Sequence, residues 1–280
     1  MAVSSEPAHT IARREPRLEY RHRLSTRIWH WVNAVTLIIM VMSGLMIFSA
    51  HPRLYWGRDG HWGMPAWLEI NASEEMGYVE IAGAMIETTG FLGGVKTSNG
   101  DVRRQVFPAW ATLPSNYNLV RAREWHITFA WLFVASFLFY AISNFVNGHF
   151  FRDHLPRLNQ CGPGNLWRCF RNHLRLSFHP EERGELYNIF QKISYFLLIY
   201  VTLPLVILTG LCMSPGMNAA LPWLTDIFGG RQSARSIHFI LAVMFILFIV
   251  VHLALVLLAR PINQMRGMIT GWARPWEREE

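Results

Sequence analysis

Apolar residues along this chain gather into four long blocks separated by polar segments. The blocks run from about Ile28 to Phe48, Ile127 to Val146, Ile193 to Met213 and Ile237 to Ala259. Each has about 20 residues, the length an α-helix needs to cross about 30 Å of hydrocarbon at about 1.5 Å per residue. The sequence lacks the regularly repeated alternating strands of a membrane barrel, and in lipid a helix satisfies its own backbone hydrogen bonds. The pattern predicts an all-α integral membrane four-helix bundle.

Composition and charge agree with a membrane protein. Of 280 residues, 51% are hydrophobic and only 16% are charged, which is too apolar for an ordinary soluble domain. Arginines crowd the tail 1–27, the segment between the second and third blocks, and the tail 261–280. Because short Arg-rich flanks stay in the cytoplasm, we expect a multi-pass protein of the bacterial inner membrane with both termini cytoplasmic.

The same topology leaves a long periplasmic loop, 51–123, within a membrane domain spanning 28–260. No small-residue cleavage site follows the first block, so we expect a retained anchor. The net charge of +7 is scattered along lipid-flanking segments, which argues against a nucleic-acid partner. The chain contains no C-x-x-C-H motif, so any haem is expected to be held by axial ligands alone.

Four of the twelve histidines lie within or beside the apolar blocks: His30, His126, His238 and His252. An imidazole in a bilayer is costly unless it is paired or coordinates something. His238 and His252 are fourteen residues apart, so at about 100° and 1.5 Å per residue they leave one helix face about 21 Å apart. One helix thus offers a ligand to each of two sites at different depths.

The flanking residues set the depth of each histidine. His30 follows Arg27 at the inner end of the first helix, and His252 lies near the inner end of the fourth. His126 and His238 begin their helices at the outer side. The predicted pairs are therefore His30 with His252 and His126 with His238.

Two imidazoles on opposite faces of one iron give a six-coordinate haem suited to electron transfer. Zinc is the rival metal, but it usually takes four ligands at one point, and here histidines come two per depth. Polar helix contacts are the alternative without any metal. Gly44 lies fourteen residues after His30, and Thr209-Gly210-Leu211 echoes Ser43-Gly44-Leu45. Both glycines suit either the approach of a flat macrocycle or close helix packing.

These motifs resemble the membrane cytochrome b subunits of formate dehydrogenase N, nickel-iron hydrogenase and thiosulfate reductase, the bacterial cytochrome b561-type proteins. The resemblance covers nearly the whole chain except the loop. It rests on the following matches: Arg27-Ile28-Trp29-His30-Trp31, Ser43-Gly44-Leu45, His126, Tyr187 to Lys192, Thr209-Gly210-Leu211, Ser236-Ile237-His238, His252 and the tail Ile262 to Trp272. It implies two haem b groups, an inner one on His30 and His252 and an outer one on His126 and His238. It also implies a quinone site at Asn188, Gln191 and Lys192, a segment that by itself is typical of a helix start.

The resemblance implies a cytochrome that transfers electrons between the quinone pool and a periplasmic oxidoreductase subunit, of the molybdenum-dependent or another respiratory type. The loop departs from the family, and its Trp-rich pieces suit either a headgroup-level position or a docking surface. A second hypothesis is a self-contained haem oxidoreductase that acts on superoxide or another small molecule. A third is a transporter or scaffold whose histidines bind no haem.

Overall fold

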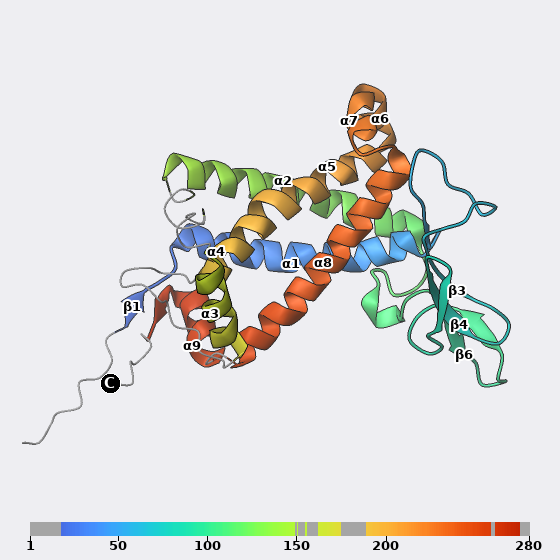
Figure 1. Cartoon of the computed structure of the whole chain (residues 1–280), viewed down its shortest axis with the longest axis horizontal. Coiled ribbons are helices and arrows are strands. Elements are labelled where there is room, and N and C mark those ends of the chain that lie inside the picture. Colours follow the sequence, from blue (N-terminus) through green and yellow to red (C-terminus); the bar gives the residue numbers. More distant parts are fainter. Residues whose placement is uncertain are drawn as a thin grey trace, which may run out of the picture.

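A computed structural model of the chain describes residues 18–148, 150, 155, 162–174, 189–258 and 261–274. Four helical spans in it are long and apolar enough to cross a membrane (Figure 1). They are α1 (Leu24–Phe48), α2 (Leu119–Val146), the third span, and α8 (Arg231–Leu258). The third span joins α4 (Ile189–Tyr195), η4 (Phe196–Thr202) and α5 (Leu203–Met213). A membrane helical bundle is what the apolar blocks predict.

The helices begin earlier than the apolar blocks and end within about one residue of them. The difference is largest in α2 and α8, whose first two turns carry polar residues such as Arg121 and Arg235. The side chain of Asn118 caps α2 by accepting a hydrogen bond from the backbone N–H of Arg121 at 3.0 Å. Hydropathy marks the lipid-crossing part of a helix, whereas caps mark its true start.

The third span is not a uniform α-helix. Pro204 has no backbone N–H, and its ring would crowd the carbonyl of Tyr200 in a regular helix. The π-helical segment η4 ends just before this proline, so the wider turn accommodates it within one continuous span.

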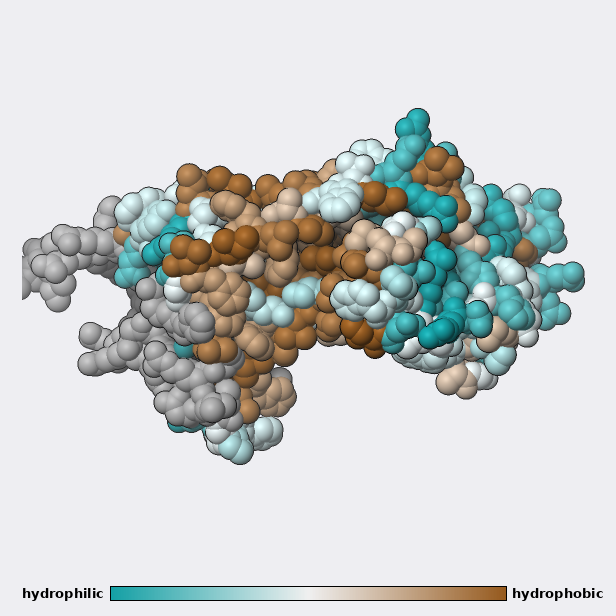
Figure 2. All heavy atoms as spheres, turned by 90° about the horizontal axis from the view of Figure 1, so that it is seen from above, coloured by the Kyte–Doolittle hydropathy of each residue, from teal (hydrophilic) through white to brown (hydrophobic). Residues whose placement is uncertain are grey.

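The bundle consists of two helical hairpins, because α1 packs mainly against α2 and α5 mainly against α8. A buried cluster joins the hairpins in the middle of the bundle, with members Phe133, Tyr140, Ile199, Leu203 and Phe245. Apolar side chains form a band across the middle of the molecule, and hydrophilic residues gather at one end (Figure 2). Most of the apolar window of α8 faces outward, as expected of a helix that contacts lipid.

The segment 49–118, here called the β-rich segment, corrects the all-α prediction. A four-stranded antiparallel sheet has the order β2-β3-β4-β5, and β6 pairs with β7. The strands are β2 (Arg53–Leu54), β3 (Leu68–Ala72), β4 (Gly77–Ile81), β5 (Ala84–Glu87), β6 (Gly94–Lys96) and β7 (Val102–Arg104), and a short helix η1 (Ala109–Ala111) follows. Ala82 and Gly83 both have positive φ, as a two-residue hairpin between β4 and β5 requires.

The two ends of the bundle differ. The β-rich segment lies beside the C-terminal end of α1 and the N-terminal ends of α2 and α8, with α6 (Pro215–Ala220) and α7 (Pro222–Ile227) near the same end (Figure 1). The opposite end holds α3 (Pro163–Leu174), α9 (Pro261–Thr270) and the antiparallel pair β1 (Glu19–Tyr20) with β8 (Trp272–Ala273). The described parts of both termini therefore lie together, at the end of the bundle opposite the β-rich segment.

Candidate functional site: two histidine pairs in the bundle

The structure brings the four intramembrane histidines together two by two. The ring centroids of His126 and His238 are 6.3 Å apart, and those of His30 and His252 are also 6.3 Å apart. We call His126 and His238 the β-side pair and His30 and His252 the α9-side pair, after the structures at each end. The fourteen-residue spacing on α8 separates the two pairs by about 21 Å along the helix axis.

The β-side pair is held by hydroxyl groups from the neighbouring helices. Ser43 Oγ lies 3.1 Å from Nδ1 of His126, and Thr209 Oγ1 lies 3.1 Å from Nδ1 of His238. Both hydroxyl residues are fully buried. Each hydroxyl also donates its proton to the carbonyl one turn earlier, Ser43 to Ile39 at 2.6 Å and Thr209 to Leu205 at 2.7 Å.

These contacts determine which ring nitrogen carries the proton. A hydroxyl that donates to a carbonyl can only accept from the imidazole, so Nδ1 of each ring is the donor. The Val206 carbonyl, 3.0 Å from Nδ1 of His238, supports the same tautomer because a carbonyl cannot donate. Each neutral ring therefore leaves Nε2 with its lone pair, which is the atom a metal ion can take.

Gly44 and Gly210 lie against these two rings. A methyl group on Gly44 would approach Cε1 of His126 to 3.3 Å, and one on Gly210 would approach Cε1 of His238 to 3.3 Å. Both distances are tighter than ordinary van der Waals contact, so a side chain would push the imidazole. The absence of a side chain at Gly44 and Gly210 thus leaves room for the histidine rings. From the sequence, these glycines were expected to make room for a flat macrocycle or to allow close helix packing.

The α9-side pair has different surroundings. Nδ1 of His30 is buried and has no hydrogen-bond partner among the described residues. The ring of His30 meets the edge of Trp31 at 5.0 Å, and Phe248 stacks on His252 at 5.6 Å. Trp31 in turn donates to the Met268 carbonyl at 3.1 Å, which ties this end of α1 to α9.

An apolar layer separates the two pairs. Phe133 lies seven residues after His126, and Phe245 lies midway between His238 and His252. Both are buried in the central cluster with Leu203. The chain thus builds two sites with a packed core between them, and not one continuous channel.

The spacing of each pair fits one iron between two imidazoles. With a metal–nitrogen bond of about 2.0 Å and a ring centre about 1.1 Å from its nitrogen, the two centroids would be about 6.2 Å apart. A tetrahedral zinc site finds no support, because no group of three or more His, Cys, Asp or Glu side chains comes together in the described part of the chain. The residues present fit a bis-histidine haem at each level.

The residues predicted to bind quinone are only partly described. Asn188 lies outside the described residues, and Gln191 is placed on α4 without a described side chain. Lys192 follows on α4, and its side chain is buried. The start of α4 is at the same end of the bundle as α9 (Figure 1).

The β-rich segment is fixed to the start of α8, close to His238. The Ser236 hydroxyl donates to the Tyr55 carbonyl at 2.6 Å and accepts from Nε1 of Trp67 at 3.0 Å. The backbone N–H groups of Gln232 and Ser233 donate to the Gly57 carbonyl at 3.0 and 3.1 Å, which caps the helix. The segment therefore forms a packed cover over this end of α8.

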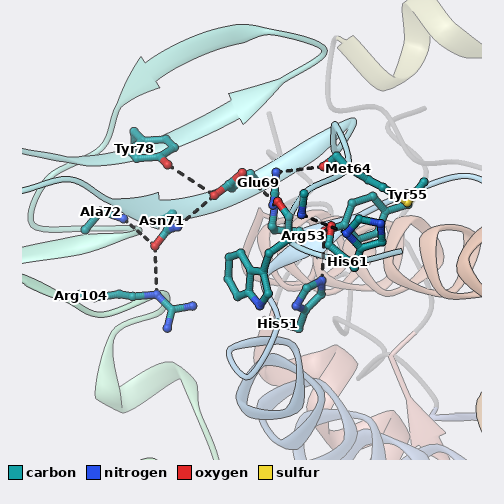
Figure 3. Close-up of polar contacts among 12 residues, drawn as sticks. His51, Arg53, Tyr55, His61, Met64, Glu69, Asn71, Ala72, Tyr78 and Arg104 are labelled. Carbon is teal, nitrogen blue, oxygen red and sulfur yellow. Dashed lines mark hydrogen bonds and ion pairs between the residues drawn. The ribbon is translucent and has the colours of Figure 1, made fainter. Parts of the chain in front are cut away.

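A polar network inside the β-rich segment centres on Glu69 (Figure 3). Its carboxylate lies 2.9 Å from Nε of Arg53 and accepts from Asn71 at 2.9 Å and from Tyr78 at 3.4 Å. Burial, followed by the negative charge of Glu69, raises the pKa of Tyr78. Burial and the positive charges of Arg235 and Arg53 lower the pKa of His51, whose ring lies 3.1 Å from the Tyr55 hydroxyl. The partly buried His51 ring therefore contacts a polar side chain of the β-rich segment.

Comparison with known proteins shows the family to which the chain belongs. The family model for prokaryotic cytochrome b561 matches residues 21–271, which include both histidine pairs and the β-rich segment. The chain belongs to the prokaryotic cytochrome b561 family. It is a b561-type membrane haem protein, and electron transfer is the activity that the family supports.

A curated relative extends the comparison. The chain is 23% identical over 232 residues to a protein of Azospira oryzae described as a putative protein-methionine-sulfoxide reductase subunit YedZ1. The aligned region covers 83% of this chain and 87% of the relative. No solved structure gives a significant match.

Sequence reasoning about this b561-type protein missed the contacts of Ser43 and Thr209 with the histidines. The signal was present in the echo between Ser43-Gly44-Leu45 and Thr209-Gly210-Leu211. The sequence suggested a role for the glycines but not for the hydroxyl residues, because the sequence of one helix does not show how that helix is rotated against its neighbour.

Proposed function

We propose that this cytochrome binds two haem b groups and transfers electrons between the quinone pool and a periplasmic redox partner. His30 and His252 hold the inner haem, and His126 and His238 hold the outer one. The observation that carries the proposal is the pair of equal 6.3 Å separations at two levels of one bundle. Bound haem supplies reversible one-electron transfer.

The protein's own residues supply position and insulation. Two imidazoles would hold each haem, and a haem held in this way would supply electron transfer and not oxygen binding. Ser43 and Thr209 keep the proton on Nδ1 of the outer ligands and leave Nε2 free. The apolar layer around Phe133 and Phe245 excludes water between the two levels.

For the quinone site we propose Asn188, Gln191 and Lys192 at the inner end of the third span. A Lys ammonium and an Asn or Gln amide can donate hydrogen bonds to a quinone carbonyl. Lys192 supports this assignment by its place, because its side chain is buried on α4, which begins at the end of the bundle that also holds α9. The cytoplasm then lies on the side of both termini, and the β-rich segment lies in the periplasm of a bacterial inner membrane protein.

The β-rich segment favours a protein as the outer partner. It covers the start of α8 with buried contacts such as Ser236 to Tyr55, whereas direct reaction with superoxide would need an open path to the outer pair. The relative described as a putative reductase subunit also favours a partner enzyme. We propose a periplasmic oxidoreductase as that partner, with molybdenum enzymes among the candidates.

The test is haem quantification with a reduced-minus-oxidised optical spectrum of the purified protein. We expect two haem b per chain. His238→Ala should remove the outer haem and His252→Ala the inner one, and His61→Ala, an exposed histidine of the β-rich segment, should keep both. A colourless protein would refute the proposal, and loss of the same haem in both histidine variants would refute the pairing.

A further inference from the structure

The two hairpins hold their β-side histidines in the same way. In the first hairpin, Ser43 and Gly44 of α1 meet His126 of α2. In the second, Thr209 and Gly210 of α5 meet His238 of α8. The distances match, with 3.1 Å from each hydroxyl to Nδ1 and 3.3 Å from each added methyl group to Cε1. The histidines even occupy the same place in their helices, since each is the eighth residue of its helix.

A helix hydroxyl does not need this second contact. Ser and Thr in apolar helices satisfy themselves by donating to the carbonyl one turn earlier, and both residues here do so. Their remaining lone pairs face an imidazole N–H in a place without access to water, because both residues are fully buried. Thr36, on the same helix as Ser43, is equally buried, but its hydroxyl has no partner among the described residues. A buried hydroxyl group in this bundle therefore does not always contact a histidine.

We propose that Ser43 and Thr209 are positioning residues of the outer haem, which orient its two axial histidines and lower its midpoint potential. This inference rests on the proposed function, because it requires the outer pair to bind haem. The proposal concerns the outer haem alone. The inner ligand His30 has a buried Nδ1 with no partner among the described residues.

The direction of the effect follows from the hydrogen bonds. An acceptor on Nδ1–H makes the imidazole a stronger electron donor through Nε2. A stronger donor stabilises ferric iron more than ferrous iron, so the potential falls. Removal of the acceptors must therefore raise the potential of the outer haem.

The size of the effect is limited by neighbouring carbonyls. The Val206 carbonyl still accepts from His238 when Thr209 is changed, and the Met40 carbonyl has the matching place beside His126. Each single variant should thus produce less than a tenfold change in the preference for ferric over ferrous iron. Loss of both hydroxyls together should give about a tenfold change, which is about 59 mV for a one-electron couple.

The experiment is a spectroscopic redox titration of the full-length protein in nanodiscs. The variants are Ser43→Ala, Thr209→Val and the double variant, with Thr36→Val as the control on the same helix. The His238→Ala protein identifies which of the two titration waves belongs to the outer haem. We expect the outer wave to move upward in the order single, then double variant, and the inner wave and the Thr36→Val protein to stay unchanged.

Thr209→Ser separates the hydrogen bond from packing, because it restores the hydroxyl without the methyl group. Recovery of the original outer potential, or of outer haem lost from Thr209→Val, supports the proposal. An unmoved outer wave in the double variant overturns it, as does an equal shift of both waves or a failure of Thr209→Ser to recover. Two bound haems with unmoved potentials refute this inference alone, whereas a chain without haem refutes the proposed function.

Discussion

Charge removal at Glu69 tests whether the β-rich segment depends on its buried ion pair. Arg53 and Glu69 have side chains only 12% and 11% exposed, with Nε and Oε2 2.9 Å apart. Glu69→Gln removes the negative charge and keeps a carbonyl oxygen for Asn71 and Tyr78. Breaking a buried ion pair costs about 3–5 kcal/mol, because the remaining charge is left without its partner. The residual exposure and the poor alignment of the Arg53 Nε–H place the expected cost near the lower end.

The chain offers a matched control at the same distance. Arg58 and Asp226 also form an ion pair of 2.9 Å, but their side chains are 76% and 58% exposed. Water screens such a pair, and its loss costs less than about 1 kcal/mol. Asp226→Asn should therefore leave the β-rich segment almost as stable as before, although it removes the same kind of charge from a contact of the same length.

Amide hydrogen exchange of β3 and β4 in the nanodisc-embedded protein measures both costs. A loss of about 3 kcal/mol lowers protection by roughly a hundredfold, whereas a loss below about 1 kcal/mol lowers it less than about fivefold. Equal loss of protection in Glu69→Gln and Asp226→Asn would show that burial does not set the strength of these pairs.

Two further predictions concern the histidines. A methyl group in Gly210→Ala would approach Cε1 of His238 to 3.3 Å, so this variant should lose the outer haem or bind it more weakly. Gly216→Ala has nothing within 4 Å of the new methyl group and should keep its full haem content. Optical spectroscopy measures the haem content of both variants. The pKa of His51 is below its usual 6.5. Burial is the largest cause, and the positive charges of Arg235, Arg53 and Arg104 lower the pKa further, against the negative charge of Glu69. Its stabilising contribution is therefore complete above about pH 6.5 and is lost as pH falls through the lowered pKa. Acid should speed amide exchange in β2 and β3 of the native protein, but less so in His51→Gln. An identical pH response in the variant would exclude His51 as the cause.

The sequence predicts the four spans well because the length of an apolar block is a direct measure of hydrocarbon thickness. It also predicts which histidines meet, since fourteen residues on α8 fix one face and two depths. The starts of α2 and α8 were placed too late, at Ile127 and Ile237 instead of Leu119 and Arg231, because their polar first turns carry no hydropathy signal.

The β-rich segment was not predicted, since its strands are two to five residues long and lie between glycine turns. The alternation of apolar and polar residues is a weak signal over so few residues. Leu68 to Ala72 is recognised as a strand only from its pairing with Gly77 to Ile81. The hydroxyl contacts of Ser43 and Thr209 depend on how α1 and α5 are rotated against their neighbours. That rotation is a property of packing, which the residue order of one helix does not encode.

The division into two hairpins has a consequence for biogenesis. Each histidine pair takes one ring from the first hairpin and one from the second, because His30 and His126 lie on α1 and α2, whereas their partners lie on α8. Direct backbone approaches between the hairpins are sparse compared with those inside each. A porphyrin bound by either pair would add a second link between the hairpins, beside the central apolar cluster. Starvation for haem during synthesis should then leave hairpins that associate less firmly, and quality-control proteases should degrade the protein faster.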